Sequence, residues 1–350
     1  MEREMGQFGL ADYYAAKNRI RASFLDGVEA MMNWKRIEKV LHAGLGRDNR
    51  VVRSGPKHYP ALVMFKILLL RQWYGLSDQE TEFALLDRIS FSRFTRIALS
   101  ESVPDHTTIC RFRNLLVEKT LLQPLLDEVN RQFEKQGKLV KKGVAVDASI
   151  IASAARPRKS VDIESMPEDR AEDAAPVDEK AQVTVNYSKD PDAAWLKKGK
   201  ECHYGYKAHT AVDAVGGLIL TGHVTPANKS DTGQLERLVA DSDLPDKARV
   251  YADKGYTSKR NSEILKNRNC KDGIMSRAYR NKSLTARQQK RNRKISKKRY
   301  IVERVFGTLK KCYDLARASY LGVAKVQGEL LLSSLAYNLK RGLFLQPAQA

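Results

Sequence analysis

The sequence predicts a mixed α/β fold preceded by an all-helical region, and two observations support this prediction. Apolar residues recur with helical spacing through about residue 140. From residue 143 onward the spacing shortens to two, which is the period of a β-strand. We therefore expect a helical N-terminal domain over residues 1–140 and an α/β domain over residues 141–345.

The N-terminal domain is expected to contain one buried helix followed by shorter, capped ones. Residues 60–74 are apolar on most faces, and Pro60 stands where a helix can begin. Ser77 and Glu80 form the capping-box pattern that starts a second helix. Short capped turns of this kind separate the helices of a compact bundle.

A third helix is expected to begin at Asp105 or Thr107, either of which could cap it. Arg111 and Arg113 lie close to its start. Helices joined by short turns, with basic residues near a helix start, are typical of helix-turn-helix DNA readers, so both arginines are candidate DNA contacts. A helical bundle used for dimerisation is the alternative, and the two roles are compatible.

Residues 152–200 interrupt the α/β pattern. Segment 161–179 carries eight acidic residues against one basic residue and contains two prolines. Such a segment cannot bury enough apolar surface to fold alone, so we expect a flexible acidic insertion. It could be a linker with no specific role, or its charge could screen a basic DNA channel until DNA arrives.

Regular structure is expected again from His203 onward. The first two strands after it are joined by a glycine-containing turn, which predicts a hairpin. The expected elements, in order, are strands at 204–212 and 218–224, a helix through Leu235, a strand over 248–253, a helix near 258–267, a short strand at 273–276 and a helix over 299–310.

Three acidic residues lie in contexts that are unusual for purely structural residues. Asp147 and Asp253 lie on or directly after short apolar strands, and Glu303 lies between the apolar and polar faces of a helix. Carboxylates on rigid elements that meet in space can hold Mg²⁺, and two such ions assist phosphoryl transfer. Each residue could instead be structural: a strand-end turn for either aspartate, or a helical pair with Arg299 for the glutamate.

The charge balance favours a nucleic-acid partner. The chain has 62 Lys and Arg against 41 Asp and Glu, a formal net charge of +21. Residues 277–300 hold eleven basic residues and no acidic one, so they are expected to contact DNA phosphates rather than form only a solvated helix face. The candidate contacts in this segment are Lys290, Arg291, Arg293, Lys294, Lys297 and Lys298.

Two further basic residues flank the glutamate on the predicted helix. Arg299 lies one turn before Glu303 and Lys310 lies two turns after it. An arginine can grip a phosphate with two hydrogen bonds, and a lysine supplies a point charge. Both residues are therefore expected to hold DNA phosphates near the acidic residues.

Other features limit the compartment. The four cysteines lack paired spacing, which predicts free thiols in a reducing compartment. The N-terminus has no apolar signal region, and the most apolar stretch is interrupted by Lys66 and Arg71. We expect a cytoplasmic protein with no membrane partner and no small-molecule substrate.

Over most of its length the chain resembles the DDE transposases of bacterial insertion sequences, specifically the insertion-sequence-five group. Around the glutamate, that group's signature Tyr-x2-Arg-x3-Glu-x6-Lys is matched by Arg299, Glu303 and Lys310, while Ser296 stands at the tyrosine position. The other matching segments are Gln-Trp-Tyr-Gly-Leu-Ser-Asp at 72–78, Val-Pro-Asp-His-Thr-Thr-Ile-Cys-Arg-Phe-Arg at 103–113, Val-Asp-Ala-Ser at 146–149, Tyr-Lys-Ala-His-Thr-Ala-Val-Asp at 206–213 and Ala-Asp-Lys-Gly-Tyr at 252–256.

The resemblance implies an RNase H-like mixed sheet flanked by helices, with Asp147, Asp253 and Glu303 as a catalytic triad that holds two Mg²⁺ or Mn²⁺ ions. It implies a bacterial transposase, at least a homodimer, that binds terminal inverted repeats and joins them to double-stranded target DNA. Such a protein would be nucleoid-associated when bound. The alternatives are an RNase H-like nuclease without strand joining and a non-catalytic DNA-binding regulator.

Overall fold

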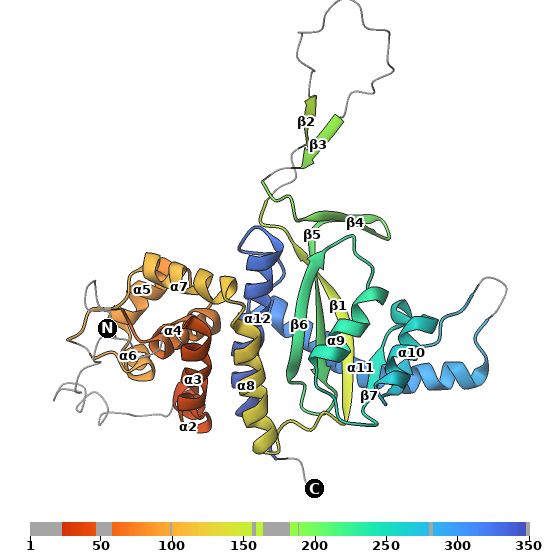
Figure 1. The fold of residues 1–350 in the computed structure, drawn as a ribbon, viewed down its shortest axis with the longest axis horizontal. Helices are drawn as coiled ribbons and strands as arrows, with labels where there is room; N and C mark the ends of the chain where they lie inside the picture. The colour runs from red at the N-terminus through yellow and green to blue at the C-terminus, as the bar shows by residue number, and fades with distance from the viewer. Residues whose placement is uncertain are drawn as a thin grey trace, which may run out of the picture.

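The computed structural model describes residues 23–46, 58–98, 100–155, 159–163, 183–187, 189–279 and 283–347. A helical N-terminal part lies beside a six-stranded mixed sheet (Figure 1). The helices of the N-terminal part are α2 (Phe24–Met31), α3 (Trp34–Leu45), α4 (Ala61–Tyr74), α5 (Asp78–Asp87), α6 (Ile89–Thr95), α7 (His106–Glu118) and α8 (Leu122–Lys135).

The sequence patterns predicted the starts of three of these helices correctly. The predicted buried helix is α4, which begins after Pro60 and has eleven of its fourteen residues buried. The predicted capping box is present in α5, where Ser77 and Glu80 each accept a hydrogen bond from the other's backbone N–H. Asp105, one of the two caps considered, accepts from the backbone of Thr108 at the start of α7.

The central strand of the sheet is β1. It pairs antiparallel with β5 and parallel with β7; β7 in turn pairs parallel with β8, and β6 lies against β5. This order, with helices on both faces, confirms the predicted RNase H-like sheet. The strands are β1 (Gly143–Ala152), β4 (Ala194–Lys198), β5 (Glu201–Asp213), β6 (Ile219–Pro226), β7 (Arg249–Ala252) and β8 (Lys271–Ile274).

The register assigns the helices to opposite faces of the sheet. Asp147 on β1 meets Arg299 of α11 (Ala286–Cys312), so α11 covers the face of Asp147. The next residue, Ala148, pairs with His209 on β5, and His209 pairs in turn with His223 on β6. The His223 ring is hydrogen-bonded to Gln234 of the 3₁₀ turn η1 (Thr232–Gln234), so this turn lies on the other face. The helices α9 (Leu235–Asp241) and α10 (Lys259–Asn267) follow this turn, and Figure 1 shows α9 on the side of the sheet away from α11.

The last helix, α12 (Val323–Gly342), joins the helical part to the sheet. It packs on α8 and α4 on one side and on β6 on the other. Two glycines allow this approach: a Cβ on Gly328 would lie 2.5 Å from Val117, and one on Gly342 would lie 2.4 Å from Phe133. Both parts therefore share one hydrophobic core.

The range 152–200 is more regular than the sequence predicted. The strands β2 (Lys159–Ile163) and β3 (Val183–Tyr187) pair antiparallel, and β4 extends the main sheet along β5. Asp190, expected to belong to a surface segment, is fully buried and accepts hydrogen bonds from the hydroxyls of Ser153 and Tyr206. Most of the acidic run, residues 164–182, lies outside the described residues.

Two observations bear on the predicted compartment. All four cysteines are free thiols, as expected. In the described ranges no helix combines the length and the apolarity needed to span a bilayer. The charge in the middle of α4, that of Lys66, is neutralised inside the helical part by Glu29 at 2.6 Å, so α4 is a core helix.

Candidate active site

Asp147 lies in the middle of the central strand β1. The residues before it, Val144 to Val146, are fully buried and fix the strand in the sheet. The Asp147 side chain retains 20 % of its exposure, on the face covered by α11. A carboxylate is thereby held on a rigid element at the border between core and solvent.

Asp253 follows directly on the neighbouring strand β7. The parallel pairing joins Val144 to Val250 and Ala145 to Tyr251, and two residues further along the same register reaches Asp147 and Asp253. The Asp253 Oδ1 accepts a hydrogen bond of 2.7 Å from the backbone N–H of Gly255, within the 3₁₀ turn η2 (Lys254–Tyr256). The turn fixes this carboxylate oxygen, and within the described ranges no hydrogen bond engages the other one.

Glu303 lies on α11, which packs on β1 and β7. The helix begins with a capping box of Thr285 and Gln288 and continues for 27 residues, so it starts earlier than the sequence suggested. Val302 and Val305 anchor it to the sheet, and both are fully buried. Glu303 stands beside this apolar stripe with its side chain 47 % exposed, as the helical pattern predicted.

Arg299 connects the two elements. Its Nη1 lies 2.6 Å from the Oδ2 of Asp147, and its Nη2 donates to the Oε1 of Glu303. The helical pair considered from the sequence therefore exists, but it extends to the strand residue as well. One guanidinium bridges carboxylates from β1 and α11.

Burial controls the charge of the strand carboxylate. Desolvation raises the pKa of Asp147 to about 6, the cation of Arg299 opposes this shift, and the nearby Asp253 adds to it. A buried carboxylate beside a second carboxylate favours any added positive charge. The arginine supplies that charge in this structure.

The chemistry of these donors fits a hard divalent cation, because all three supply carboxylate oxygens. Their present arrangement does not form a closed site: across the described ranges, no three His, Cys, Asp or Glu side chains come close enough together to hold a metal ion. The guanidinium of Arg299 stands between Asp147 and Glu303 as a cation in that position.

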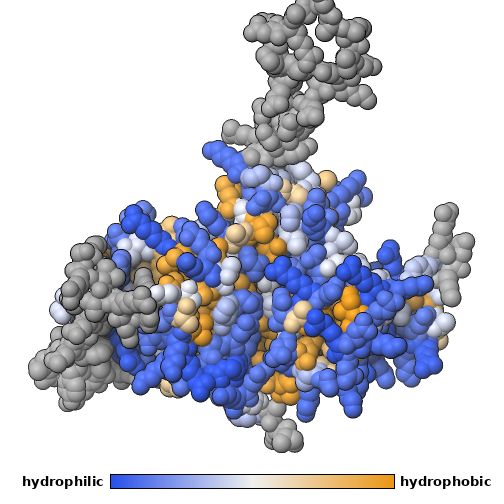
Figure 2. All heavy atoms as spheres, in the orientation of Figure 1, coloured by the Kyte–Doolittle hydropathy of each residue, from blue (hydrophilic) through white to orange (hydrophobic). Residues whose placement is uncertain are grey.

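The basic residues of α11 divide into two groups. Arg291 is committed to β8: its guanidinium donates to the backbone oxygens of Ile274 and Asp272, which makes it less available to DNA than predicted. The predicted contacts that are exposed are Lys290, Arg293, Lys294, Lys297 and Lys298. The face seen in Figure 2 is predominantly hydrophilic over α10 and the adjoining part of α11.

Lys310 lies further along α11, half-buried near a second cation. Burial lowers the pKa of its ammonium, and the charge of Lys198 on β4 lowers it further. The β4–β5 hairpin thus approaches the C-terminal half of α11. This proximity could not be read from the sequence, because the two lysines are far apart in the chain.

Arg113 is not placed as predicted. It is 5 % exposed, and its Nη1 lies 2.6 Å and 2.8 Å from the two carboxylate oxygens of Asp78. A buried guanidinium requires such a partner, so Arg113 fastens α7 to α5 and is unavailable to DNA. Arg111 lies two residues earlier, on the opposite face of α7, and is exposed.

A cleft beside Asp253 contains residues that sequence reasoning did not single out. It is lined by Asp253, Lys254, Gly255, Arg277 and Ala278. Lys254 and Arg277 place two cations next to a candidate catalytic carboxylate. The sequence could have indicated Lys254, because this residue directly follows Asp253.

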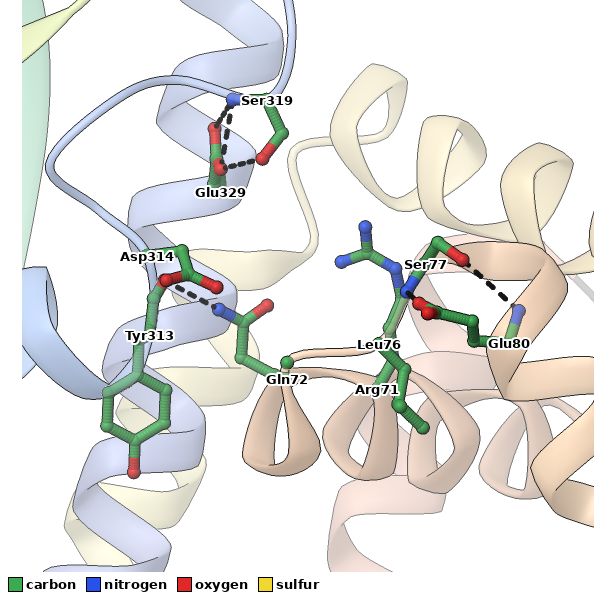
Figure 3. Close-up of a pocket in the computed structure, with 10 residues that line it drawn as sticks. Arg71, Gln72, Leu76, Ser77, Glu80, Tyr313, Asp314, Ser319 and Glu329 are labelled. Carbon is green, nitrogen blue, oxygen red and sulfur yellow. Dashed lines mark hydrogen bonds between the residues drawn. The ribbon is translucent and has the colours of Figure 1, made fainter.

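A second pocket, of about 370 Å³, separates the C-terminal end of α4 from the segment between α11 and α12 (Figure 3). Its wall includes Gln72, whose amide donates to the backbone oxygen of Tyr313, and Glu329, which accepts from Ser319. None of the three candidate carboxylates lines it. The Gln72 contact connects the helical part to the segment that follows α11, and the Glu329 contact fastens that segment to α12.

Comparisons with known proteins all point to transposases. The model of the family described as "Transposase DDE domain" matches residues 139–339, and that described as "Transposase domain (DUF772)" matches residues 13–115. The chain is 41 % identical over 233 residues to the transposase for insertion sequence element IS1106 of Neisseria meningitidis serogroup B, covering 65 % of this chain and 75 % of the relative.

Among solved structures, the piggyBac transposase synaptic complex with hairpin DNA is similar over 88 % of this chain and 72 % of its own. Its TM-score is 0.41 and its sequence identity is 10 %.

Proposed function

The chain belongs to the DDE transposase family, and we propose that Asp147, Asp253 and Glu303 are its catalytic carboxylates. The protein is a DNA transposase that cleaves DNA strands and transfers them, and enzymes of this family depend on a divalent metal. The observation that carries the assignment is the bridge of Arg299 between Asp147 and Glu303, together with the strand register that leads from Asp147 to Asp253.

The three carboxylates would hold two Mg²⁺ ions, or Mn²⁺ in their place. Bound there, the ions would activate the attacking oxygen and stabilise the leaving oxygen of an in-line phosphoryl transfer. Asp147 and Asp253 contribute ligands from adjacent strands, so their spacing is set by the sheet. Glu303 contributes from a helix anchored to the same strands.

Arg299 would have two roles in turn. In this structure it neutralises Asp147 and Glu303. A DNA phosphate brought to the site would compete for the same N–H donors, because a guanidinium binds phosphate with the same two-pronged geometry as a carboxylate. Arg299 and Lys310 would then hold phosphates on either side of the scissile bond.

The exposed cations in the first half of α11 would carry DNA toward the carboxylates, with Lys254 and Arg277 at the cleft of Asp253. The helical part, residues 1–140, would bind the terminal inverted repeats, with Arg111 as an exposed contact. Residues 141–345 would form the catalytic domain. Bringing two DNA ends together requires at least a homodimer.

The test is incubation of the protein with a supercoiled plasmid that carries the candidate element ends, with and without Mg²⁺. Metal-dependent cuts at the ends, followed by joining to a labelled target, are the expected result. Cleavage without joining would indicate a nuclease, and binding to the ends without cleavage would indicate a regulator.

A further inference from the structure

The hydroxyl of Tyr256 is buried beside the carboxylates without a hydrogen-bond partner. Tyr256 is 1 % exposed, and its Oη lacks any donor or acceptor within reach among the described residues. The residue closes the turn η2, three positions after Asp253, and its backbone N–H donates to the backbone oxygen of Asp253. The turn that fixes Asp253 therefore also fixes this ring.

Charged groups of the candidate active site act on the hydroxyl electrostatically. Burial raises its pKa well above the usual value, the carboxylates of Asp147, Asp231 and Asp253 raise it further, and the guanidinium of Arg299 opposes them. Of these charges, that of Asp147 acts most strongly. The hydroxyl stays protonated in the working pH range and can act as a donor to a carboxylate.

An unpaired buried hydroxyl is costly, and phenylalanine would fill the same space without that cost. Tyr206 on β5 is the contrasting case in this fold. Its hydroxyl donates to Asp190 and accepts from the backbone N–H of Gly322, so its role in the structure is evident. The hydroxyl of Tyr256 has no such structural role.

Two other buried polar atoms near Asp147 are unpaired as well: the Nε of Arg299 and the Oγ1 of Thr210. Thr210 lies directly opposite Asp147 in the β1–β5 register and shares its face of the sheet. Donors therefore outnumber acceptors around this carboxylate while Arg299 occupies it. The surplus becomes useful only if Arg299 leaves.

We propose that Tyr256 is a positioning residue of the active site, whose hydroxyl donates to the Asp147 carboxylate once Arg299 leaves it for a DNA phosphate. The inference rests on the proposed function, in which Asp147 is catalytic. A carboxylate that keeps only 20 % of its exposure needs a replacement donor when the guanidinium turns away. The Tyr256 hydroxyl, fixed by the turn after Asp253, can supply this donor.

The test is Tyr256→Phe in the full chain. Thermal unfolding without metal is expected at the same temperature as the wild type or higher, because no hydrogen bond is removed. Cleavage is expected to slow by about 10- to 100-fold, the usual loss when a group that orients a metal ligand is removed. The rise in Tm produced by Mn²⁺ alone is expected to shrink, while binding to the element ends stays unchanged.

Tyr206→Phe is the matched control: it removes a paired hydroxyl, so its unfolding temperature is expected to fall while the folded protein still cleaves. Wild-type cleavage and an unchanged Mn²⁺ shift in Tyr256→Phe would overturn the proposal, as would a loss of Tm like that of the control. Slow cleavage in Thr210→Val with normal Tyr256→Phe would give the role to Thr210 instead. Asp147→Ala distinguishes the two levels, since normal cleavage there would refute the proposed function itself.

Discussion

The guanidinium of Arg299 lies 2.6 Å from the carboxylate of Asp147, although 152 positions separate the two residues in the chain. This contact joins the helix that carries Glu303 to the central strand of the sheet. A single arginine therefore bridges two of the proposed catalytic carboxylates.

Replacement of any proposed catalytic carboxylate should abolish cleavage. We expect Asp147→Ala, Asp253→Ala and Glu303→Ala each to lower the cleavage rate by at least about a thousandfold, because each removes a metal ligand. Binding to the element ends should remain near the wild-type level, since none of the three anchors DNA. Plasmid cleavage and a gel-shift assay measure the two properties, and wild-type cleavage by one variant removes that residue from the set.

Arg113 and Arg111 should separate stability from DNA binding. Arg113→Ala removes the hydrogen bonds of its guanidinium to Asp78, which keeps Arg71 as a partner, so we expect a loss of about 1.5–3 kcal/mol in the free energy of unfolding. Arg111→Ala, on the exposed side of the same helix, should leave stability within about 0.5 kcal/mol and weaken DNA binding. Urea unfolding measures the stability and DNA titration measures the affinity. A stable Arg113→Ala variant with weakened DNA binding, beside a destabilised Arg111→Ala variant, would contradict this assignment.

The exposed cations of α11 should act on DNA without reading its sequence. Neutralising Arg293, Lys294 and Lys297 should weaken binding to all DNA about equally and reduce the salt slope by about one for each phosphate that is no longer neutralised. A variant that neutralises Lys247, Arg249 and Arg268, which are exposed near the start of β7 at the end of this strand away from Asp253, carries the same change in net charge and should largely keep the slope. Equal slopes for the two variants would mean that only net charge matters.

The stacked pair His209 and His223 should make the fold sensitive to acid. Burial lowers the pKa of both, and that of His209 falls to about 3. The folded state therefore binds fewer protons than the unfolded state between about pH 6.5 and the folded pKa, and stability present above pH 6.5 is lost as the pH falls. The loss should approach roughly 1.4 kcal/mol per histidine per pH unit.

Urea unfolding at pH 7 and pH 5 measures this dependence. His209→Gln should reduce the difference between the two pH values, because the glutamine has no proton to gain. An unchanged difference in this variant would assign the acid sensitivity to other groups.

The acidic run should be removable at its base. Ile163 and Val183 are paired across β2 and β3, so a two-residue Asn-Gly turn can replace residues 164–182 without moving either strand. We expect unchanged thermal unfolding and retained cleavage. Asp190→Ala is the contrasting variant: it leaves the hydroxyls of Ser153 and Tyr206 without their acceptor and should lower the unfolding temperature. Unfolding of the shortened chain would show that the removed residues contribute to the core.

The parts of the fold that depend on neighbouring residues could be predicted from the sequence. The capping box of Ser77 and Glu80 and the buried helix after Pro60 are local patterns, and both are present. The commitment of Arg113 to Asp78 could not be predicted, because the two side chains meet only after α5 and α7 pack. The pairing of β2 with β3 was not predicted for a related reason. The acidic residues between these two short strands made the whole range look like a flexible insertion.

The candidate site shows the same division. The three carboxylates could be proposed from strand and helix context, since each context is local. The burial of Tyr256 depends on how the turn after β7 packs on η1 and α10, and the register that leads from Asp147 to Asp253 depends on pairing between distant segments. Long-range placement of this kind leaves little trace in a single sequence.

The position of α12 limits when the chain can fold during its synthesis. This helix fills the space between α8 and β6, with Gly328 and Gly342 allowing close contact to the helices made first. A ribosome-bound chain lacking it exposes apolar surface on both the helical part and the sheet. The nascent protein can therefore complete its core only after α12 has left the ribosomal tunnel, and a product truncated before that helix should aggregate or be degraded rather than retain a separately folded DNA-binding portion.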